Sequence, residues 1–279
     1  MFAYLRAHPQ IFMPNYKEPH FFGSDVSHPR RFSMEEYLAL FAGAEETRRA
    51  GEASVSYLFS QKAAREIKEF NPDSSIIIML RNPVDMIYSW HSQLLYLGIE
   101  TVQDFETALS LEEKRRRGDC LPDAEAAPQA YFYREVARFT PQVRRYLDVF
   151  CRERVHIIIF DDLRIDRVRI FRETLRFLAV TDDFQSELNV VNPNKQFRIG
   201  RLQTFMRQPP SALRTLSHAL MPRRLRNALY DRLSHLNTSY KPRPPMDPEL
   251  KKRLQAEFAP DVEELGALLG RDLSRWSKQ

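Results

Sequence analysis

An arginine, an asparagine and a serine stand at spacings that could build an anion-binding site. Arg81 directly follows an apolar run at residues 75–80, and Asn82 precedes Pro83, a residue favoured at the first position of a helix. Asn82 can cap that helix, and Ser89 lies about two helical turns further along the same face. A helix N-terminus with an arginine and a hydroxyl beside it favours a phosphate, although an ordinary capped helix with a surface arginine fits the spacing equally well.

The composition is that of a globular protein, with 43% hydrophobic and 28% charged residues in a chain of 279. It excludes a mainly disordered chain, and the longest apolar runs are far shorter than the roughly 20 residues of a membrane span. The net charge of +5 fits an anionic ligand and does not demand nucleic acid. The two cysteines, Cys120 and Cys151, make no disulfide framework and no signal peptide is visible, so we expect a cytoplasmic protein.

The sequence lacks the short motifs of several common classes of protein. No GxGxxG or glycine-rich Lys-Ser/Thr loop indicates a dinucleotide or Walker site, and no HExxH, GxSxG or paired CxxC pattern indicates a zinc enzyme or a serine hydrolase. The basic runs at residues 114–117 and 222–226 are typical of solvated helix faces. We therefore expect neither a metal nor a nucleic-acid partner.

Hydrophobic runs predict the elements that must position these residues. Residues 75–80 and 155–160 are short apolar runs bounded by polar residues, typical of buried parallel strands, and residues 55–58 are a weaker candidate. Helical stretches precede and follow these strands, at residues 62–70, 86–97, 102–116, 141–152 and 167–178. The alternation of helix and strand predicts an α/β fold with a parallel sheet between two layers of helices.

The chain changes character after residue 211, where strand signals disappear. We expect helices at residues 212–220, 223–236 and 248–269, with a proline-rich extended loop before the last of them. Residues 118–129 are polar and rich in small side chains, which predicts an exposed, mobile loop. We interpret the chain as one domain with a helical C-terminal elaboration.

The segment Arg81-Asn-Pro-x-Asp-x-x-x-Ser89 resembles the 3′-phosphate-binding motif of the sulfotransferases that use 3′-phosphoadenylyl sulfate (PAPS). Three further segments of the chain resemble segments of these sulfotransferases, and they occur in the same order as in the family. Residues 8–14 with 17–22 are similar to the catalytic segment of bacterial sulfotransferases and of the heparan sulfate glucosaminyl enzymes, and residues 51–58 are similar to their next strand. Residues 240–250, with an end at 270–276, resemble their nucleotide-covering loop and final helix. The resemblance implies a P-loop-NTPase-like parallel sheet flanked by helices.

The resemblance also implies roles for particular residues. In the family, the glutamate that matches Glu18 is the general base that takes the proton from the acceptor, and the histidine that matches His20 lies beside it. The residues that match Arg81 and Ser89 hold the 3′-phosphate. The basic pair of a loop that closes over the nucleotide corresponds to Lys241 and Arg243. Without the resemblance, Glu18 and His20 would be interpreted as surface residues, and the basic pair as part of a solvated loop.

The sequence departs from the family pattern at two places. The family has a Lys-x-Gly-Thr-Thr phosphate loop just before the helix that matches residues 2–7, and Met1 stands immediately after the position of that loop. We therefore expect residues 1–279 to form a single sulfotransferase domain that is truncated and lacks the first strand and the 5′-phosphosulfate loop. Ala53 replaces a lysine of the heparan enzymes, and their cysteine pair has no counterpart, which points to the bacterial branch.

The sequence thus predicts a PAPS-dependent sulfotransferase that moves a sulfuryl group to a hydroxyl or amine of a small-molecule or glycan acceptor, without a metal. The alternative is a catalytically inactive relic of the same fold that binds a nucleotide or a partner. A sequence-independent nucleic-acid binder comes third. Because the phosphate loop is missing, we expect the chain as given to transfer sulfate poorly.

Overall fold

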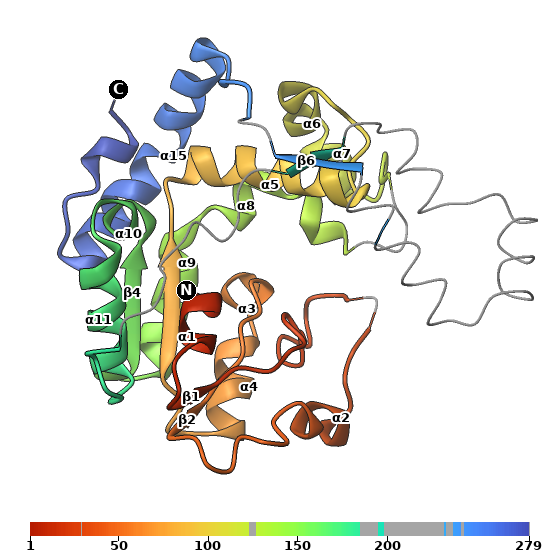
Figure 1. Ribbon diagram of the computed structural model, residues 1–279. Helices are drawn as coiled ribbons and strands as arrows, with labels where there is room; N and C mark the ends of the chain where they lie inside the picture. Colours follow the sequence, from red (N-terminus) through yellow and green to blue (C-terminus); the bar gives the residue numbers. More distant parts are fainter. Residues whose placement is uncertain are drawn as a thin grey trace, which may run out of the picture.

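The computed structural model describes residues 1–28, 30–122, 127–184, 195–197, 232, 237–240 and 243–278 (Figure 1). Its main parallel pair is made of β3 (Ile76–Leu80) and β4 (Val155–Ile159), with Ile76 opposite Val155 and Leu80 opposite Ile159. Both strands are those predicted from the apolar runs. Such runs suit strands that are covered on both faces, which is the position that these two occupy.

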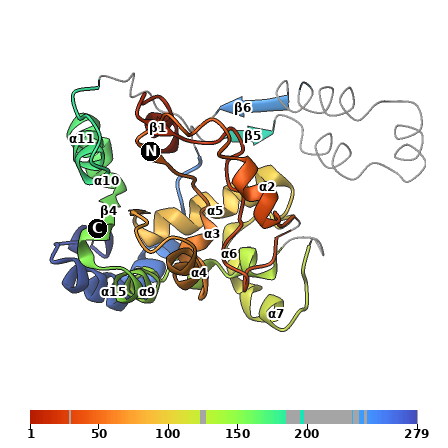
Figure 2. The same cartoon turned by 90° about the horizontal axis from the view of Figure 1, so that it is seen from below.

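Alternate residues of the β3–β4 pair enter different helical layers. Ile78 and Leu80 lie in the main core with side chains of α5, α9 and α15. Ile77 and Ile158 point to the opposite face, where α1, α10 and α11 cover them. Figure 2 shows α10 and α11 on one side of β4 and α9 and α15 on the other. This is the three-layer α/β architecture that the sequence predicts.

Two shorter strand pairs accompany the main one. β1 (Ile11–Phe12) and β2 (Arg49–Ala50) are parallel, whereas β5 (Lys195–Phe197) and β6 (Thr238–Tyr240) are antiparallel. Within the described ranges the β1–β2 pair shares no hydrogen-bonded strand with β3–β4. The prediction of a single domain without its first strand and phosphate loop stays a prediction.

The prediction of a strand at residues 55–58 is wrong. Ser56–Phe59 form the helix α3, and the strand of this region, β2, ends earlier at Ala50. A four-residue apolar run does not distinguish a strand from a helix, so tertiary contacts decide. Here the α3 backbone is held by the Tyr146 hydroxyl of α9, which donates to the carbonyl of Tyr57 at 2.9 Å.

The remaining helices follow the predicted order. Their bounds are α1 (Phe2–Arg6), α2 (Met34–Ala39), α4 (Ala63–Phe70), α5 (Pro83–Leu97), α6 (Phe105–Ser110), α7 (Glu112–Arg116), α8 (Tyr133–Val136), α9 (Phe139–Val149), α10 (Phe160–Ile165), α11 (Arg167–Phe177) and α15 (Pro248–Leu269), with 3-10 turns at Pro128–Tyr131, Arg152–Arg154 and Ser274–Trp276. The helix expected at residues 102–116 is two helices that meet at Leu111, and the first begins at Phe105 because Asp104 caps it by accepting from the Thr107 N–H at 2.7 Å. The helices predicted at 212–220 and 223–236 lie outside the described residues, residue 232 excepted.

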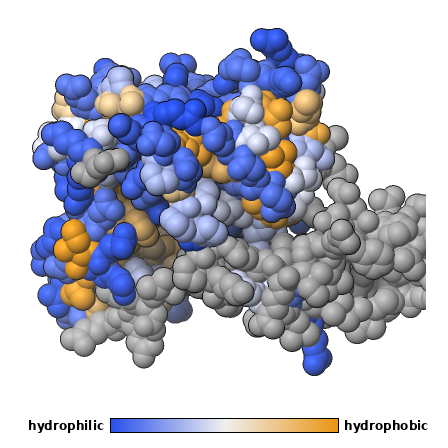
Figure 3. Space-filling model, turned by 90° about the horizontal axis from the view of Figure 1, so that it is seen from above, coloured by the Kyte–Doolittle hydropathy of each residue, from blue (hydrophilic) through white to orange (hydrophobic). Residues whose placement is uncertain are grey.

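The surface is mostly polar. Figure 3 shows a hydrophilic face with apolar side chains in scattered patches, and exposed large apolar residues such as Ile165 and Val168 are few. Among the described helices, none is both long and apolar enough to cross a bilayer.

Candidate active site

The first centre forms where β3 passes into α5. The Asn82 side chain accepts from the Val84 N–H at 3.0 Å, which makes it the predicted cap, and its own amide donates to the Trp276 carbonyl at 3.3 Å. Arg81 leaves the strand beside this cap, with its guanidinium 5.4 Å from the ring centre of Phe160. The positive end of the α5 dipole and the Arg81 cation therefore meet at the carboxyl edge of the sheet.

A loop from the far end of the sequence returns to α5. Arg243 donates to the hydroxyl of Ser89 at 3.1 Å and to that of Ser92 at 2.7 Å, and its guanidinium stands 5.0 Å from the ring centre of Tyr88. The Tyr88 hydroxyl donates to the carbonyl of Pro244 at 3.1 Å. Ser89 and Arg243, predicted separately from two distant motifs, are in direct contact.

Two like charges meet at this helix end. Burial lowers the pKa of the Arg243 guanidinium, and the positive charge of Arg81 lowers that pKa further. Asp85 lies 3.9 Å from Arg81, but its carboxylate is 53% exposed and neutralises the pair weakly. An anion bound between the two guanidinium groups would remove this repulsion. Lys241, the other predicted member of the loop, lies outside the described residues.

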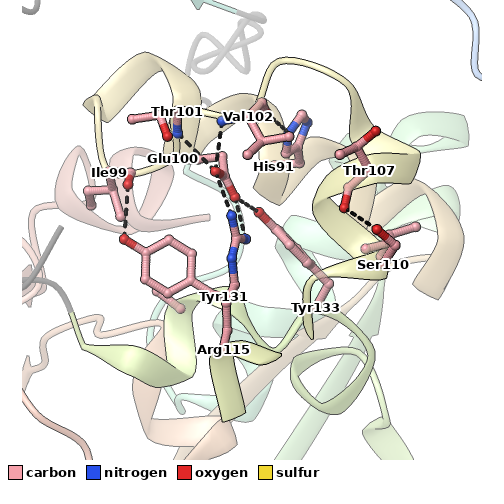
Figure 4. A network of polar contacts seen from close by, with 12 residues as sticks. His91, Ile99, Glu100, Thr101, Val102, Thr107, Ser110, Arg115, Tyr131 and Tyr133 are labelled. Carbon is pink, nitrogen blue, oxygen red and sulfur yellow. Dashed lines mark hydrogen bonds and ion pairs between the residues drawn. The ribbon is translucent and has the colours of Figure 1, made fainter. Parts of the chain in front are cut away.

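The far end of α5 is anchored by a buried ion pair (Figure 4). Glu100 accepts from Arg115 through both carboxylate oxygens, at 2.6 and 2.9 Å, and from the Tyr133 hydroxyl at 2.7 Å. The N–H groups of Thr101 and Val102 also donate to it. Burial alone would raise the pKa of Glu100, but these bonds outweigh burial and lower it. Glu100 therefore fixes the helix that carries Ser89.

The second centre is the segment that holds the predicted base. The Glu18 carboxylate lies 2.6 Å from the Lys17 ammonium and 3.7 Å from Nε2 of His20. Glu18 and His20 have φ angles of 60° and 49°, in the left-handed region that costs such residues on the order of 1–3 kcal/mol each. The structure thus brings the predicted catalytic pair together on a strained backbone.

Hydrogen bonds from the β2–α3 connection hold this backbone. The Glu18 N–H donates to the carbonyl of Ala53 at 3.1 Å, and the His20 N–H donates to the Ser54 hydroxyl at 3.2 Å. Residues 51–58, which the family resemblance assigned to a strand, therefore form a connection and the start of α3. Polar groups of this connection bind the segment that carries the predicted base.

A second hydroxyl continues the same support. Tyr57 accepts from the N–H groups of Phe21 and Phe22 at 3.0 and 3.2 Å. Behind both hydroxyls lies the carboxylate of Glu52, which accepts from the Ser54 hydroxyl at 3.0 Å. Sequence reasoning missed Glu52, although it stands directly before Ala53, a position that the family comparison had already singled out.

His20 packs against a second imidazole and a hydroxyl. Its ring stacks on that of His28 with centres 3.8 Å apart, and its Nδ1 lies 2.8 Å from the Ser56 hydroxyl. Burial lowers the pKa of both imidazoles, and burial together with the neighbouring His20 and Arg31 brings that of His28 to about 4. His20 is therefore neutral at physiological pH and can position a group by hydrogen bonding. No group of three or more metal-ligating side chains gathers among the residues with a described placement.

Comparison with solved structures finds the crystal structure of a sulfotransferase from Alicyclobacillus acidocaldarius. The two chains share 31% sequence identity and superpose with a TM-score of 0.72, over 99% of this chain and 92% of the other. No protein-family model and no curated protein sequence matches this chain.

Proposed function

The chain belongs to the sulfotransferase family, and from that premise we propose that it transfers a sulfuryl group from PAPS to a hydroxyl or amine acceptor. The donor supplies the sulfuryl group, and adenosine 3′,5′-bisphosphate is the product that leaves. One observation carries the proposal: Arg243 donates to Ser89 although 154 residues separate them. Two residues that the family resemblance assigns, from separate motifs, to one nucleotide are therefore in direct contact.

The proposed donor site is the β3–α5 junction. Arg81 and Arg243 would bind the 3′-phosphate, which would also receive the Ser89 hydroxyl and lie at the positive end of the α5 dipole. The like-charged arginine pair supports this assignment, since a doubly charged phosphate would relieve its repulsion. Lys241 would close over the same nucleotide, as the family resemblance implies.

The proposed base is Glu18. As the acceptor oxygen or nitrogen bonds to sulfur, the sulfur–oxygen bond to the bisphosphate breaks, and the acceptor proton passes to the Glu18 carboxylate. His20, neutral and 3.7 Å from Glu18, would hold the acceptor or the carboxylate in place. The proposed acceptor is a hydroxyl or amine of a small molecule or a glycan.

Radiolabelled transfer separates this enzyme from the inactive relic of the same fold. The chain is incubated with PAPS labelled in its sulfuryl group and with a panel of hydroxyl and amine acceptors, while calorimetry measures binding of adenosine 3′,5′-bisphosphate. Binding with turnover supports the enzyme. Binding without turnover on any acceptor identifies the relic, and absence of both refutes the proposed site.

The variant Glu18→Gln tests the base. It keeps the shape and removes the proton acceptor, so turnover should fall by about 10²–10⁴ while bisphosphate affinity is unchanged. Glu173→Gln, which changes an exposed carboxylate of α11 in an ion pair with Arg169, is the matched control and should retain the wild-type rate. Wild-type turnover in Glu18→Gln would place the base elsewhere, with His20 the next candidate.

A further inference from the structure

Glu52 is a buried carboxylate that the proposed mechanism does not use. It lies two residues after β2, behind the connection that faces the predicted base. One oxygen, Oε2, accepts from the Ser54 hydroxyl at 3.0 Å, and the Tyr57 hydroxyl lies close enough to the carboxylate to lower its pKa. The other oxygen, Oε1, is buried and has no hydrogen-bond partner among the described residues. A buried carboxylate with an unsatisfied oxygen is costly, so its presence calls for a physical reason.

The two hydroxyls transmit the effect of Glu52 to the catalytic segment. A hydroxyl has one proton to donate and lone pairs to accept with. Since Ser54 gives its proton to Glu52, its lone pairs are available to the His20 N–H. Tyr57 accepts from the N–H groups of Phe21 and Phe22, and its own proton is available to the carboxylate of Glu52 beside it. Glu52 therefore sets the direction of both hydroxyls.

The backbone that these hydroxyls bind is strained. Glu18 and His20 both have left-handed φ angles, and a segment of non-glycine residues adopts such angles only where its surroundings hold it. The His20 bond to Ser54 and the adjacent bonds to Tyr57 are three of the contacts that hold it here.

We propose that Glu52 is a positioning residue for sulfuryl transfer, which acts by orienting Ser54 and Tyr57 so that they hold the strained segment that presents Glu18. The proposal rests on the proposed role of Glu18 as the base. Glu52 does not touch the reacting groups in this arrangement and acts only through the two hydroxyls.

The environment of Glu52 adds a pH signature. Burial raises the pKa of Glu52, the hydroxyls of Tyr57 and Ser54 lower it, and the negative charge of Glu18 raises it; together they bring the pKa to about 7. Tyr37 of α2 and Tyr146 of α9 also face this charge. Glu52 thus loses its charge as the pH falls through about 7. Because an ionised carboxylate accepts stronger hydrogen bonds than a neutral one, the hold on the segment weakens over the same range.

Two measurements on Glu52→Gln test the proposal, and Asp261→Asn is the matched control. Asp261, on α15, is also a carboxyl whose pKa is raised by burial. It accepts a hydrogen bond from the N–H of Phe139, the first residue of α9, at 3.1 Å. In Glu52→Gln we expect kcat to fall by about tenfold to hundredfold, as small misplacements of a catalytic group do, with bisphosphate affinity unchanged. The fall of kcat in the wild type below about pH 7 should be absent from Glu52→Gln. Asp261→Asn should keep both the rate and the profile.

Amide hydrogen exchange measures how firmly the catalytic segment is held, and it does not depend on turnover. The amides of residues 20–22 should exchange about tenfold to hundredfold faster in Glu52→Gln than in the wild type, and Asp261→Asn should leave them protected. If Glu52→Gln does not fold, Ser54→Ala and Tyr57→Phe each remove one hydroxyl and should show the same two changes to a smaller extent. Unchanged exchange at these amides overturns the proposal, whatever the activity. Faster exchange in a chain without turnover leaves the structural role of Glu52 standing and refutes the proposed function instead.

Discussion

Removal of Arg243 is the sharpest perturbation of the proposed donor site. Its guanidinium is half-buried, donates to Ser89 and Ser92, and stacks over Tyr88. Arg243→Ala deletes a charged donor at the phosphate position and also releases the loop from α5. Only the first effect depends on the nucleotide, so binding and stability measurements can separate the two.

The magnitude follows from the kind of bond that is lost. A hydrogen bond to a charged group contributes about 1.5–3 kcal/mol, which corresponds to a tenfold to hundredfold loss of affinity. Arg243→Lys keeps the charge but loses the planar pair of donors, so its affinity should lie between those of the wild type and Arg243→Ala. Because Ser89 touches Arg243, the effects of Ser89→Ala and Arg243→Ala should not be additive, with a coupling of about 0.5–3 kcal/mol.

Calorimetry with adenosine 3′,5′-bisphosphate at two ionic strengths is the assay. Affinity of the wild type should fall between 0.01 and 0.15 M salt, where the screening length shortens from about 30 to about 8 Å, and Arg243→Ala should depend on salt less steeply. Arg169→Ala, an exposed arginine of α11 in an ion pair with Glu173, is the control and should bind like the wild type. Equal affinities for Arg243→Ala and wild type, with equal thermal stability, would refute the donor site.

Three further predictions concern single carboxylates and the other arginine. Arg81→Ala should weaken bisphosphate binding about tenfold to hundredfold in the same calorimetric assay, and unchanged affinity would remove Arg81 from the site. Glu100→Gln leaves Arg115 charged and buried, so urea unfolding should show a loss of about 3–5 kcal/mol; a loss below about 1 kcal/mol would contradict the buried ion pair. Burial raises the pKa of Glu52 from 4.5 to about 7, so its contribution to stability is full below pH 4.5 and is lost as the pH rises through about 7. At about 1.4 kcal/mol per pKa unit the loss is about 3 kcal/mol, which urea unfolding from pH 4.5 to 8 should detect in the wild type and not in Glu52→Gln.

Local signals in the sequence determined the two central strands, the start of α5 and the bounds of the final helix. The apolar runs at residues 76–80 and 155–159, the asparagine cap at Asn82 and the proline after it act within a few residues, so they predict structure without knowledge of the rest of the chain. The same is true of the long final helix, Pro248–Leu269, which has the predicted bounds. These features also placed Arg81 directly before α5 and Ser89 about two turns along the same helix.

Tertiary structure alone decided what depends on distant contacts. The run at residues 55–58 became a helix because α9 and the catalytic segment bind its polar groups, and no local pattern contains that information. The left-handed backbone at Glu18 persists because another segment accepts the hydrogen bonds that hold it. The contact of Arg243 with Ser89 and the raised pKa of Glu52 have the same origin. Burial and hydrogen-bond direction are properties of the folded surroundings, and residues far apart in sequence supply those surroundings.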